Sequence, residues 1–308
     1  MPDLHPDVQS HLDEFLHLPS LVEAGPEGAR EQIHETHARD PDRDPVAAVT
    51  ETAVEGPAGD VPVRVYRPTE DGEHPTLLWI HGGGWVIGDL DSHDQVARAL
   101  CRTAEVTVAS VGYRRAPEHG FPAAVQDCVA ALEWAAAGNV PGGRGDALAV
   151  AGDSAGGNLS AVTALYDRDH GAHLARQVLL YPVTDDDVDR ESYHEFADGY
   201  GLTREEMVWF LEHYFPTDLH RANPYGLPMK ACDLAGLPPA TVVTAEFDVL
   251  RDEGVAYAER LADEGVPVAH HHYERMNHGF VSHLADPDLD AARDVVATVA
   301  DELEGAFT

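Results

Sequence analysis

The chain has 308 residues, of which 55 are aspartate or glutamate and 20 are lysine or arginine, so its formal net charge is −35 with histidines neutral. Phosphate groups and anionic lipids attract clustered lysines and arginines, so this balance excludes nucleic-acid binding as the main function and disfavours adhesion to a membrane surface. Hydrophobic residues make up 44% of the chain, enough to bury a sizeable core.

The first twenty residues carry charged and histidine side chains throughout and lack the continuous apolar stretch of a signal peptide. Apolar residues recur there at helical spacing and predict a helix over residues 7–18, with Val8, Leu12, Phe15 and Leu16 on one face. No apolar run long enough to span a membrane follows. The cysteines are odd in number and far apart, at Cys101, Cys128 and Cys232. Together these features predict a cytoplasmic protein without a disulfide framework.

From Pro45 onward the pattern changes to short apolar runs. Residues 47–54 and 61–68 alternate as two strands around a Gly-Pro-Ala-Gly turn signal. Further strands are predicted at residues 76–80, 106–113, 147–152, 178–183, 240–247 and 266–273. Helical patterns are found at 122–137, 155–166, 252–263 and 288–304. This alternation predicts an α/β protein with a mostly parallel sheet of about eight strands and helices on both faces.

One connection is much longer than the others. It runs from the strand at 178–183 to the strand at 240–247 and includes a helical pattern near residues 203–215. Connections of this length usually carry function, for example as a lid over a site. The alternative is an insertion whose aromatic residues only pack on the sheet.

A serine lies in a G-x-S-x-G turn, Gly152-Asp153-Ser154-Ala155-Gly156, directly after one predicted strand and before a helix. Such a turn is strained, needs small neighbours and projects the hydroxyl above the sheet edge. The dipole of the following helix points at the same place. Ser154 is therefore a candidate nucleophile, although a glycine-rich turn with an incidental serine would have the same five letters.

A second motif, His81-Gly82-Gly83-Gly84-Trp85, also follows a predicted strand directly. Consecutive glycines leave backbone N–H groups open to approach, which a developing oxyanion requires. A phosphate-binding loop is the rival interpretation, but no G-K-[ST] follows and no G-x-G-x-x-G dinucleotide fingerprint is present. We therefore expect an oxyanion hole and no cofactor.

A catalytic serine needs a base, and 19 histidines are too many to select from by residue type. Position narrows the choice, because His278 lies just beyond the strand at 266–273 and Asp248 directly follows the strand at 240–247. Both residues, like Ser154, then lie at the carboxyl edge of a parallel sheet, where such sheets bind ligands. The chain order Ser, Asp, His is that of the α/β-hydrolase triad.

Five segments together resemble the hormone-sensitive-lipase family of α/β-hydrolase carboxylesterases: HGGGW (81–85), YRRAPEHGFPAAVQD (113–127), GDSAGG (152–157), FDVLRDEG (247–254) and NHGF (277–280). The resemblance covers nearly the whole chain. It implies the α/β-hydrolase fold and a serine carboxylic-ester hydrolase that acts on small-molecule esters with short- to medium-chain acyl groups.

The resemblance also implies roles for individual residues. Ser154 is the nucleophile, His278 the base and Asp248 the acid that orients it. The oxyanion hole is formed by the N–H groups of Gly82, Gly83 and Ala155. From the residues themselves, Trp85 and the apolar side chains of the long connection suggest a closed, hydrophobic site for the acyl group.

The same family builds a cap over the site from its N-terminal helices and from an insertion before the triad aspartate. The corresponding segments here are residues 1–45 and 185–225. The hydrolase core would then consist of two parts, residues 46–184 and 226–308.

Lys230 is the only lysine, so almost all basic residues are arginines. Repulsion at this net charge destabilises the compact state at low ionic strength, and concentrated salt screens it. We therefore expect adaptation to a salty cytoplasm, such as that of a halophilic archaeon. An acidic protein of an ordinary cell would explain the sign of the charge but not the loss of lysine.

The run His270-His271-His272 does not predict a metal site. In a strand, His270 and His272 share one face and His271 lies on the other, so the three cannot bind one ion without further ligands. The HETH sequence at residues 34–37 lacks the i, i+4 histidine pair of zinc proteases. We expect no metal.

Two other functions stay open from the sequence. One is an amidase or deacetylase on the same triad. The other is a non-catalytic small-molecule binding protein, because the plant gibberellin receptors resemble this family but have lost the histidine that is present here as His278. The final predicted helix fits either a surface or the interface of a homodimer.

Overall fold

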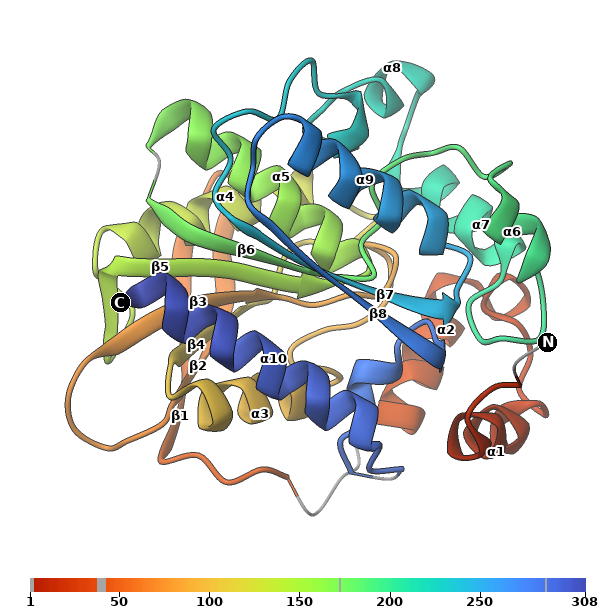
Figure 1. The fold of residues 1–308 in the computed structure, drawn as a ribbon, viewed down its shortest axis with the longest axis horizontal. Coiled ribbons are helices and arrows are strands. Elements are labelled where there is room, and N and C mark those ends of the chain that lie inside the picture. The colour runs from red at the N-terminus through yellow and green to blue at the C-terminus, as the bar shows by residue number, and fades with distance from the viewer. Residues whose placement is uncertain (1–2, 38–42, 172, 286) are drawn as a thin grey trace.

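The structure is a computed structural model that describes residues 3–37, 43–171, 173–285 and 287–308. An eight-stranded sheet runs through the middle of this part of the chain, in the order β1-β2-β4-β3-β5-β6-β7-β8 (Figure 1). The strands are β1 (Ala48–Gly56), β2 (Gly59–Arg67), β3 (His74–Ile80), β4 (Thr107–Val111), β5 (Gly143–Asp153), β6 (Leu174–Leu180), β7 (Ala240–Phe247) and β8 (Val268–Asn277). β2 pairs antiparallel with β1 and β4, and every pair from β4 to β8 is parallel. The predicted mostly parallel sheet is confirmed.

The central strands are largely buried because helices cover both faces of the sheet. All residues of β4 are buried, and so are the last five residues of β3. The edge strand β1 is mostly exposed, and polar and apolar side chains are mixed along it. This difference is the one expected between a doubly covered parallel sheet and its antiparallel edge.

Helices α3 (Asp94–Ala104) and α10 (Asp290–Phe307) cover one face of the sheet, and α4 (Ala123–Ala136), α5 (Ala155–His170) and α9 (Arg251–Asp263) cover the other (Figure 1). Four of these five follow the predicted helical patterns to within a few residues at most ends. Helix α3 is missing from the sequence prediction, although its apolar side chains repeat at helical spacing and face the core, at Val96, Ala97, Ala99, Leu100 and Cys101.

All but one of the remaining helices lie on the side of the molecule where β7 and β8 end, and α8 (Asp218–Arg221) lies at the top of the view, above α9 (Figure 1). These helices are α1 (Pro6–Phe15) and α2 (Leu21–His37) from the N-terminal segment, and α6 (Glu191–Glu195), α7 (Arg204–Tyr214) and α8 from the long connection. Two short 3₁₀ helices, Pro228–Lys230 and Phe280–Ser282, complete the described elements. Among all these helices, none combines the length and the apolar run that crossing a bilayer requires.

Helix α7 begins where the sequence carries a clear start signal. The Thr203 hydroxyl accepts a hydrogen bond from Glu206 N (3.1 Å), and the Glu206 carboxylate accepts one from Thr203 N (3.0 Å). This reciprocal cap satisfies two backbone donors that a helix start leaves unpaired. Glu206 also accepts a longer hydrogen bond from Leu21 N (3.4 Å), so the start of α7 is joined to the start of α2.

Candidate active site

Three polar side chains from separate strand ends meet at the carboxyl edge of the sheet. Ser154 follows β5 and precedes α5, Asp248 follows β7, and His278 follows β8. The three side chains are separated by up to 124 positions in the sequence, yet His278 touches both of the others. Parallel strands end at the same edge of a sheet, so this edge collects residues from distant parts of the chain.

The two ring nitrogens of His278 bind one partner each. His278 Nδ1 donates to Asp248 Oδ2 at 2.8 Å, because a carboxylate only accepts. The other nitrogen, Nε2, then lacks a proton and accepts from the Ser154 hydroxyl at 2.9 Å. This arrangement is the one in which a histidine can take the proton of a serine as that serine attacks a substrate.

Asp248 and the histidine ring are both held in place. The Asp248 side chain is fully buried, and its second oxygen, Oδ1, accepts a hydrogen bond from Leu250 N (2.9 Å). The ring of Tyr181 lies 4.7 Å from the ring of His278. With the carboxylate fixed from one side and the ring supported from another, His278 keeps the tautomer that leaves Nε2 free for Ser154.

Ser154 has a backbone conformation that residues other than glycine rarely adopt, with φ 55° and ψ −120°. Its N–H donates to Leu180 O (2.8 Å), and its C=O accepts from Val183 N (3.2 Å). Close packing around the turn explains the glycines, since a Cβ on Gly156 would lie 2.0 Å from Ile80 O. The strained turn is thus pinned by neighbouring strand ends, as expected for a nucleophile raised above the sheet.

The glycine loop after β3 supplies backbone donors beside this serine, but not the full set expected from the sequence. Gly82 N donates to Asp153 Oδ1 at 2.9 Å. This N–H is therefore already bonded in the structure, in contrast to the prediction that Gly82 contributes to an oxyanion hole. In the part of the chain that the structure describes, the N–H groups of Gly83 and Gly84 have no protein partner. Ala155 begins α5, where the N–H has no partner within the helix.

The prediction that Trp85 lines a substrate site does not fit its surroundings. Its side chain is fully buried and stacks on Tyr214 with ring centroids 4.3 Å apart. Its indole N–H reaches Asn158 Oδ1 at 3.3 Å. Trp85 therefore belongs to the packed layer between the glycine loop and α7, and it offers no surface open to an ester.

Phe210 of α7, in the long connection, packs against the glycine loop. A Cβ built on Gly84 would lie 2.1 Å from Phe210 Cδ1, so only glycine leaves room for this aromatic ring. Gly84 also has a positive φ of 56°, which glycine adopts without strain. Two constraints, steric and conformational, thus require glycine at the same position.

The histidine run has the geometry expected from a strand. His270 Nε2 and His272 Nδ1 both hydrogen-bond the Thr244 hydroxyl, at 2.9 and 3.0 Å, so these two side chains share one face. Within the described ranges, no group of three or more histidine, cysteine, aspartate or glutamate side chains could hold a metal ion.

The cysteines are free thiols. Cys101 and Cys128 are buried, and Cys232 is exposed.

Asp252 and Glu253, close to the proposed triad acid, lie in the first turn of α9 as expected, and Glu253 has a further role. The sequence suggests that Asp252 and Glu253 favour the start of the following helix. Glu253 is also fully buried and accepts hydrogen bonds from Thr184 N (2.7 Å) and the Tyr193 hydroxyl (3.0 Å). Burial raises its pKa to about 8 despite these donors. Glu253 therefore joins α9 to the start of the long connection.

Sequence reasoning misses three residues of the site: Tyr181, Asp153 and His93. Tyr181 directly follows β6, so its place after a strand end could have marked it. Asp153 occupies the variable position before the serine in the G-x-S-x-G motif, so the motif itself assigns it no role. His93 has no such signal, because it reaches Asp153 only through the fold, with Nε2 3.5 Å from Oδ2.

A family model described as the alpha/beta hydrolase fold matches residues 77–282, a span that includes Ser154, Asp248 and His278. The chain belongs to the α/β-hydrolase family. This membership agrees with the parallel sheet and with the placing of the three side chains at its carboxyl edge.

Individual proteins of this α/β-hydrolase kind are similar over most of the chain. Carboxylesterase NlhH of Mycobacterium tuberculosis is 42% identical over 289 residues, which is 91% of this chain and 90% of NlhH. Carboxylic ester hydrolase LipN of the same species is 43% identical over 242 residues, covering 76% of this chain and 64% of LipN. The crystal structure of a mutant of esterase rPPE complexed with (S)-Ac-CPA has a TM-score of 0.95 at 34% identity and covers 100% of this chain and 99% of that one.

Proposed function

We propose that this α/β-hydrolase is a serine carboxylesterase that cleaves short- to medium-chain acyl esters through an acyl-enzyme intermediate. The observation that carries the proposal is the unbroken series of hydrogen bonds from the Ser154 hydroxyl through His278 to Asp248. The similarity to two proteins named as carboxylic ester hydrolases supports an ester as the substrate class.

In the proposed reaction, His278 Nε2 takes the proton of Ser154 as the hydroxyl oxygen attacks the ester carbonyl. Asp248 stabilises the imidazolium that forms and keeps its Nδ1–H in place. The protonated His278 then gives its proton to the leaving alcohol, and the C–O bond of the ester breaks. Water repeats the sequence on the acyl enzyme and releases the acid.

The negative oxygen of the tetrahedral intermediate would be bound by backbone N–H groups. The N–H groups of Gly83 and Ala155 remain from the expected set, and the unpaired N–H of Gly84 is a candidate in place of Gly82. Loss of one such donor costs about 3 to 4 kcal/mol of transition-state stabilisation in other acyl-transfer enzymes. The positive end of α5 adds to the same field.

We propose that residues 1–45 and 185–225 form a cap over this site. Arg30 of α2 supports this role, because it donates to Val86 O and Ala116 O, both at 2.8 Å, and pairs with the Glu118 carboxylate at 2.7 Å. Helix α2 is thereby tied to the segment that continues from the glycine loop. Phe210 of α7 touches the loop from the other segment. A closed apolar cap favours small esters over lipid aggregates.

We further propose that the enzyme is adapted to high salt and works in the cytoplasm of a halophilic organism, for which an archaeon is the expectation. The net charge of −35 and the single lysine support this proposal. A homodimer stays a prediction.

The test is hydrolysis of p-nitrophenyl esters with acyl chains of two to twelve carbons, in dilute buffer and in multimolar KCl, with folding followed by circular dichroism. We expect turnover of the shorter esters in high salt, with a loss of at least about 10³-fold in Ser154→Ala. Rates should fall at the longest chains.

Ser160→Ala is the matched control. Ser160 is a buried serine of the same helix α5, and its hydroxyl donates to Gly156 O (2.8 Å), away from His278. This variant should keep wild-type turnover. A folded wild type that cleaves no ester in high salt would overturn the proposal, and cleavage of p-nitroanilides instead would reassign the enzyme as an amidase.

A further inference from the structure

The peptide groups on both sides of Gly82 are held by side chains. Before Gly82, the C=O of His81 accepts from the Tyr113 hydroxyl (2.9 Å), and the N–H of Gly82 donates to Asp153 Oδ1 (2.9 Å). After Gly82, its C=O accepts from His81 Nδ1 (2.9 Å). No space is left for a side chain, because a Cβ on Gly82 would lie 2.4 Å from Asp153 Oδ2.

These bonds determine where the next N–H points. A trans peptide is planar, so the C=O of Gly82 and the N–H of Gly83 point in opposite directions from one rigid plane. Holding the Gly82 oxygen on His81 therefore aims the Gly83 N–H away from that ring. Asp153, directly before the nucleophile, thus connects the position of Ser154 to the orientation of a proposed oxyanion donor.

Asp153 also places a negative charge beside the reaction, where a second negative charge develops on the substrate. Its side chain is only 13% exposed, so water screens this charge poorly. An unbalanced carboxylate here would oppose formation of the oxyanion. A cation is needed close to Asp153 for the site to work.

His93 is placed to supply that cation. Its Nε2 lies 3.5 Å from Asp153 Oδ2, and its Nδ1 lies 3.0 Å from the Ser92 hydroxyl. Burial lowers the pKa of His93, but the charges of Asp153 and Asp89 outweigh this effect, so the net direction is upward. The pKa of Asp153 is correspondingly lowered, since His93 outweighs the opposite effect of burial.

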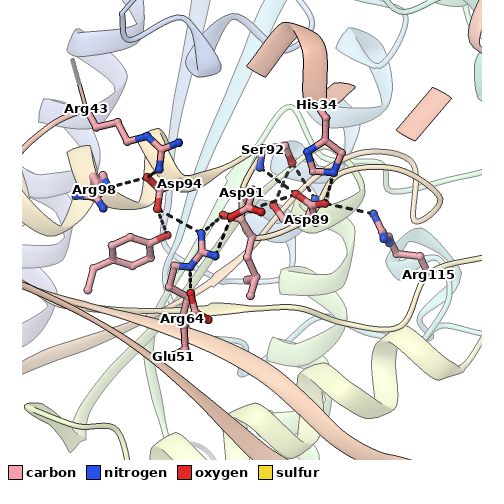
Figure 2. Close-up of polar contacts among 12 residues, drawn as sticks. His34, Arg43, Glu51, Arg64, Asp89, Asp91, Ser92, Asp94, Arg98 and Arg115 are labelled. Atoms are coloured by element: carbon pink, nitrogen blue, oxygen red, sulfur yellow. Dashed lines mark hydrogen bonds and ion pairs between the residues drawn. The ribbon is translucent and has the colours of Figure 1, made fainter. Parts of the chain in front are cut away.

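The groups around His93 agree with a protonated ring. His81, from the end of β3, lies 5.4 Å away and stays neutral, because burial and the charge of His93 lower its pKa to about 3. Asp89, on the same loop as His93, accepts from Ser92 N (3.0 Å) and pairs with His34 of α2 (2.8 Å) and, at 3.8 Å, with Arg115 (Figure 2).

The other acidic groups of this loop have arginine partners of their own. Asp91 pairs with Arg64 (2.8 Å), and Asp94 pairs with Arg98 and with Arg43 (Figure 2). Asp89, Asp91 and Asp94 thus each have an arginine partner, whereas the ion pair of Asp153 is with His93.

We propose that Asp153, paired with His93, is the positioning residue that orients the oxyanion loop through Gly82. This inference rests on the proposed esterase function. It assigns to the motif aspartate a role in transition-state stabilisation that is separate from the Ser154–His278–Asp248 series.

Two substitutions separate the hydrogen bond from the charge. Asp153→Leu removes both. We expect kcat to fall by about 10²-fold with little change in KM, because the misaimed N–H donor would have bound the substrate oxygen mainly in the transition state. Asp153→Asn keeps an oxygen for Gly82 N, and we expect a fall of less than about tenfold, because a neutral acceptor makes the weaker form of the same bond.

The pH profile of kcat supplies a readout that a merely structural role would not move. In the wild type we expect an alkaline decline as His93 loses its proton and leaves Asp153 unbalanced. Asp153→Asn should abolish this decline. His93→Gln should lower kcat at neutral pH and abolish the decline as well, since the glutamine carries no titrating charge.

Asp167→Asn is the matched control, because Asp167 is a buried aspartate at the far end of α5 that also accepts backbone hydrogen bonds, from His173 N (2.8 Å) and Leu174 N (2.9 Å). Its kcat and pH profile should equal those of the wild type. Wild-type kcat in Asp153→Leu, or an alkaline decline that persists in Asp153→Asn, would overturn the proposal while leaving the esterase function intact.

NMR spectra recorded without substrate test the positioning role even if the protein cleaves no ester. The amide proton of Gly82, bonded to a carboxylate, should resonate downfield in NMR spectra and shift upfield in Asp153→Leu, and the pKa of His93 should fall in Asp153→Asn. If the folded wild type cleaves no ester, the esterase proposal fails, and an unmoved Gly82 signal would then also overturn the positioning role.

Discussion

Two regions of this molecule bury carboxylates in opposite ways. At the carboxyl edge of the sheet, Asp248 and Asp153 each face a histidine, His278 and His93. At the start of α3, the buried Asp94 is instead bonded by the Tyr66 hydroxyl and by arginines, among them Arg64 and Arg98 (Figure 2). Arginine keeps its charge at every pH that the protein survives, whereas histidine changes its charge near neutrality.

We expect the arginine-bonded carboxylate to stabilise the fold and the histidine-paired carboxylates to serve the proposed reaction. The arginines around Asp94 come from β2, from α3 and from the segment before β1, so this carboxylate ties together parts of the chain that are distant in sequence. The histidines at the sheet edge each touch a group that we propose to react or to orient a reacting group. Replacing aspartates in the two regions should therefore have separable effects.

The largest effect is expected for the triad acid. In Asp248→Asn, the amide would favour the wrong tautomer of His278, and kcat should fall by about 10⁴-fold, as for the corresponding change in other triads. The fold should persist, since an amide oxygen can still accept from Leu250 N. Ester hydrolysis and thermal unfolding measured on the same sample check both parts, and a variant with more than a tenth of wild-type kcat would contradict the assignment of Asp248 as the triad acid.

Asp94→Asn should show the opposite pattern. Removing one partner of a buried ion pair leaves the other charges uncompensated and costs about 3 to 5 kcal/mol of unfolding free energy. Asp94 is 2% exposed, so water offers little compensation. Urea unfolding in high salt measures the loss, and kcat of the folded fraction should not change. A large loss of kcat without a loss of stability would erase the distinction between the two regions.

Glu253 gives a third kind of buried carboxylate, one whose hydrogen bonds come from the neutral donors Thr184 N and the Tyr193 hydroxyl. Its folded pKa of about 8 lies above the ordinary value of 4.5, so the folded state holds the proton more tightly. The contribution to stability is complete below pH 4.5 and is lost as the pH rises through 8, with a slope of up to about 1.4 kcal/mol per pH unit. Urea unfolding from pH 4 to 9 should show this slope in the wild type and not in Glu253→Gln.

The smallest effect is expected at the exposed rim of the arginine cluster. Glu51 of β1 pairs with Arg64 while its side chain is 61% exposed. Glu51→Gln should cost less than about 1 kcal/mol in dilute buffer, and the difference should vanish in molar KCl because salt screens exposed pairs. Urea midpoints at both salt concentrations give the answer, and a cost that persists in high salt would mean that this pair acts as part of the buried cluster.

Much of this site could be predicted because its signals are local. Ser154 and Asp248 each follow a largely apolar strand directly, and His278 follows the more polar strand β8, whose predicted end lies a few residues earlier. The strands themselves were readable because a doubly covered sheet requires nearly continuous apolar runs. Helix α3 escaped prediction even though its apolar spacing is regular.

The differences from expectation concern contacts that no local pattern records. The glycine motif predicts free N–H groups, but which of them is free depends on Asp153, which lies 71 positions away from Gly82. From the sequence, Trp85 is a plausible lining residue of an apolar site, but in the structure Tyr214 of the long connection stacks on it. In each case the partner comes from a different strand end or from the segment that packs above the sheet.

The sequence by itself determined the sheet, the strand-to-helix turn that carries Ser154, the order of the proposed triad residues and the excess of acidic charge, because each of these depends on neighbouring residues or on composition. Only the tertiary structure decided that Gly82 is occupied, that Trp85 is core and that His93 meets Asp153. The physical reason is that hydrogen bonds and ion pairs are contacts of a few ångströms, and the residues that make them are brought together only when the whole sheet has formed.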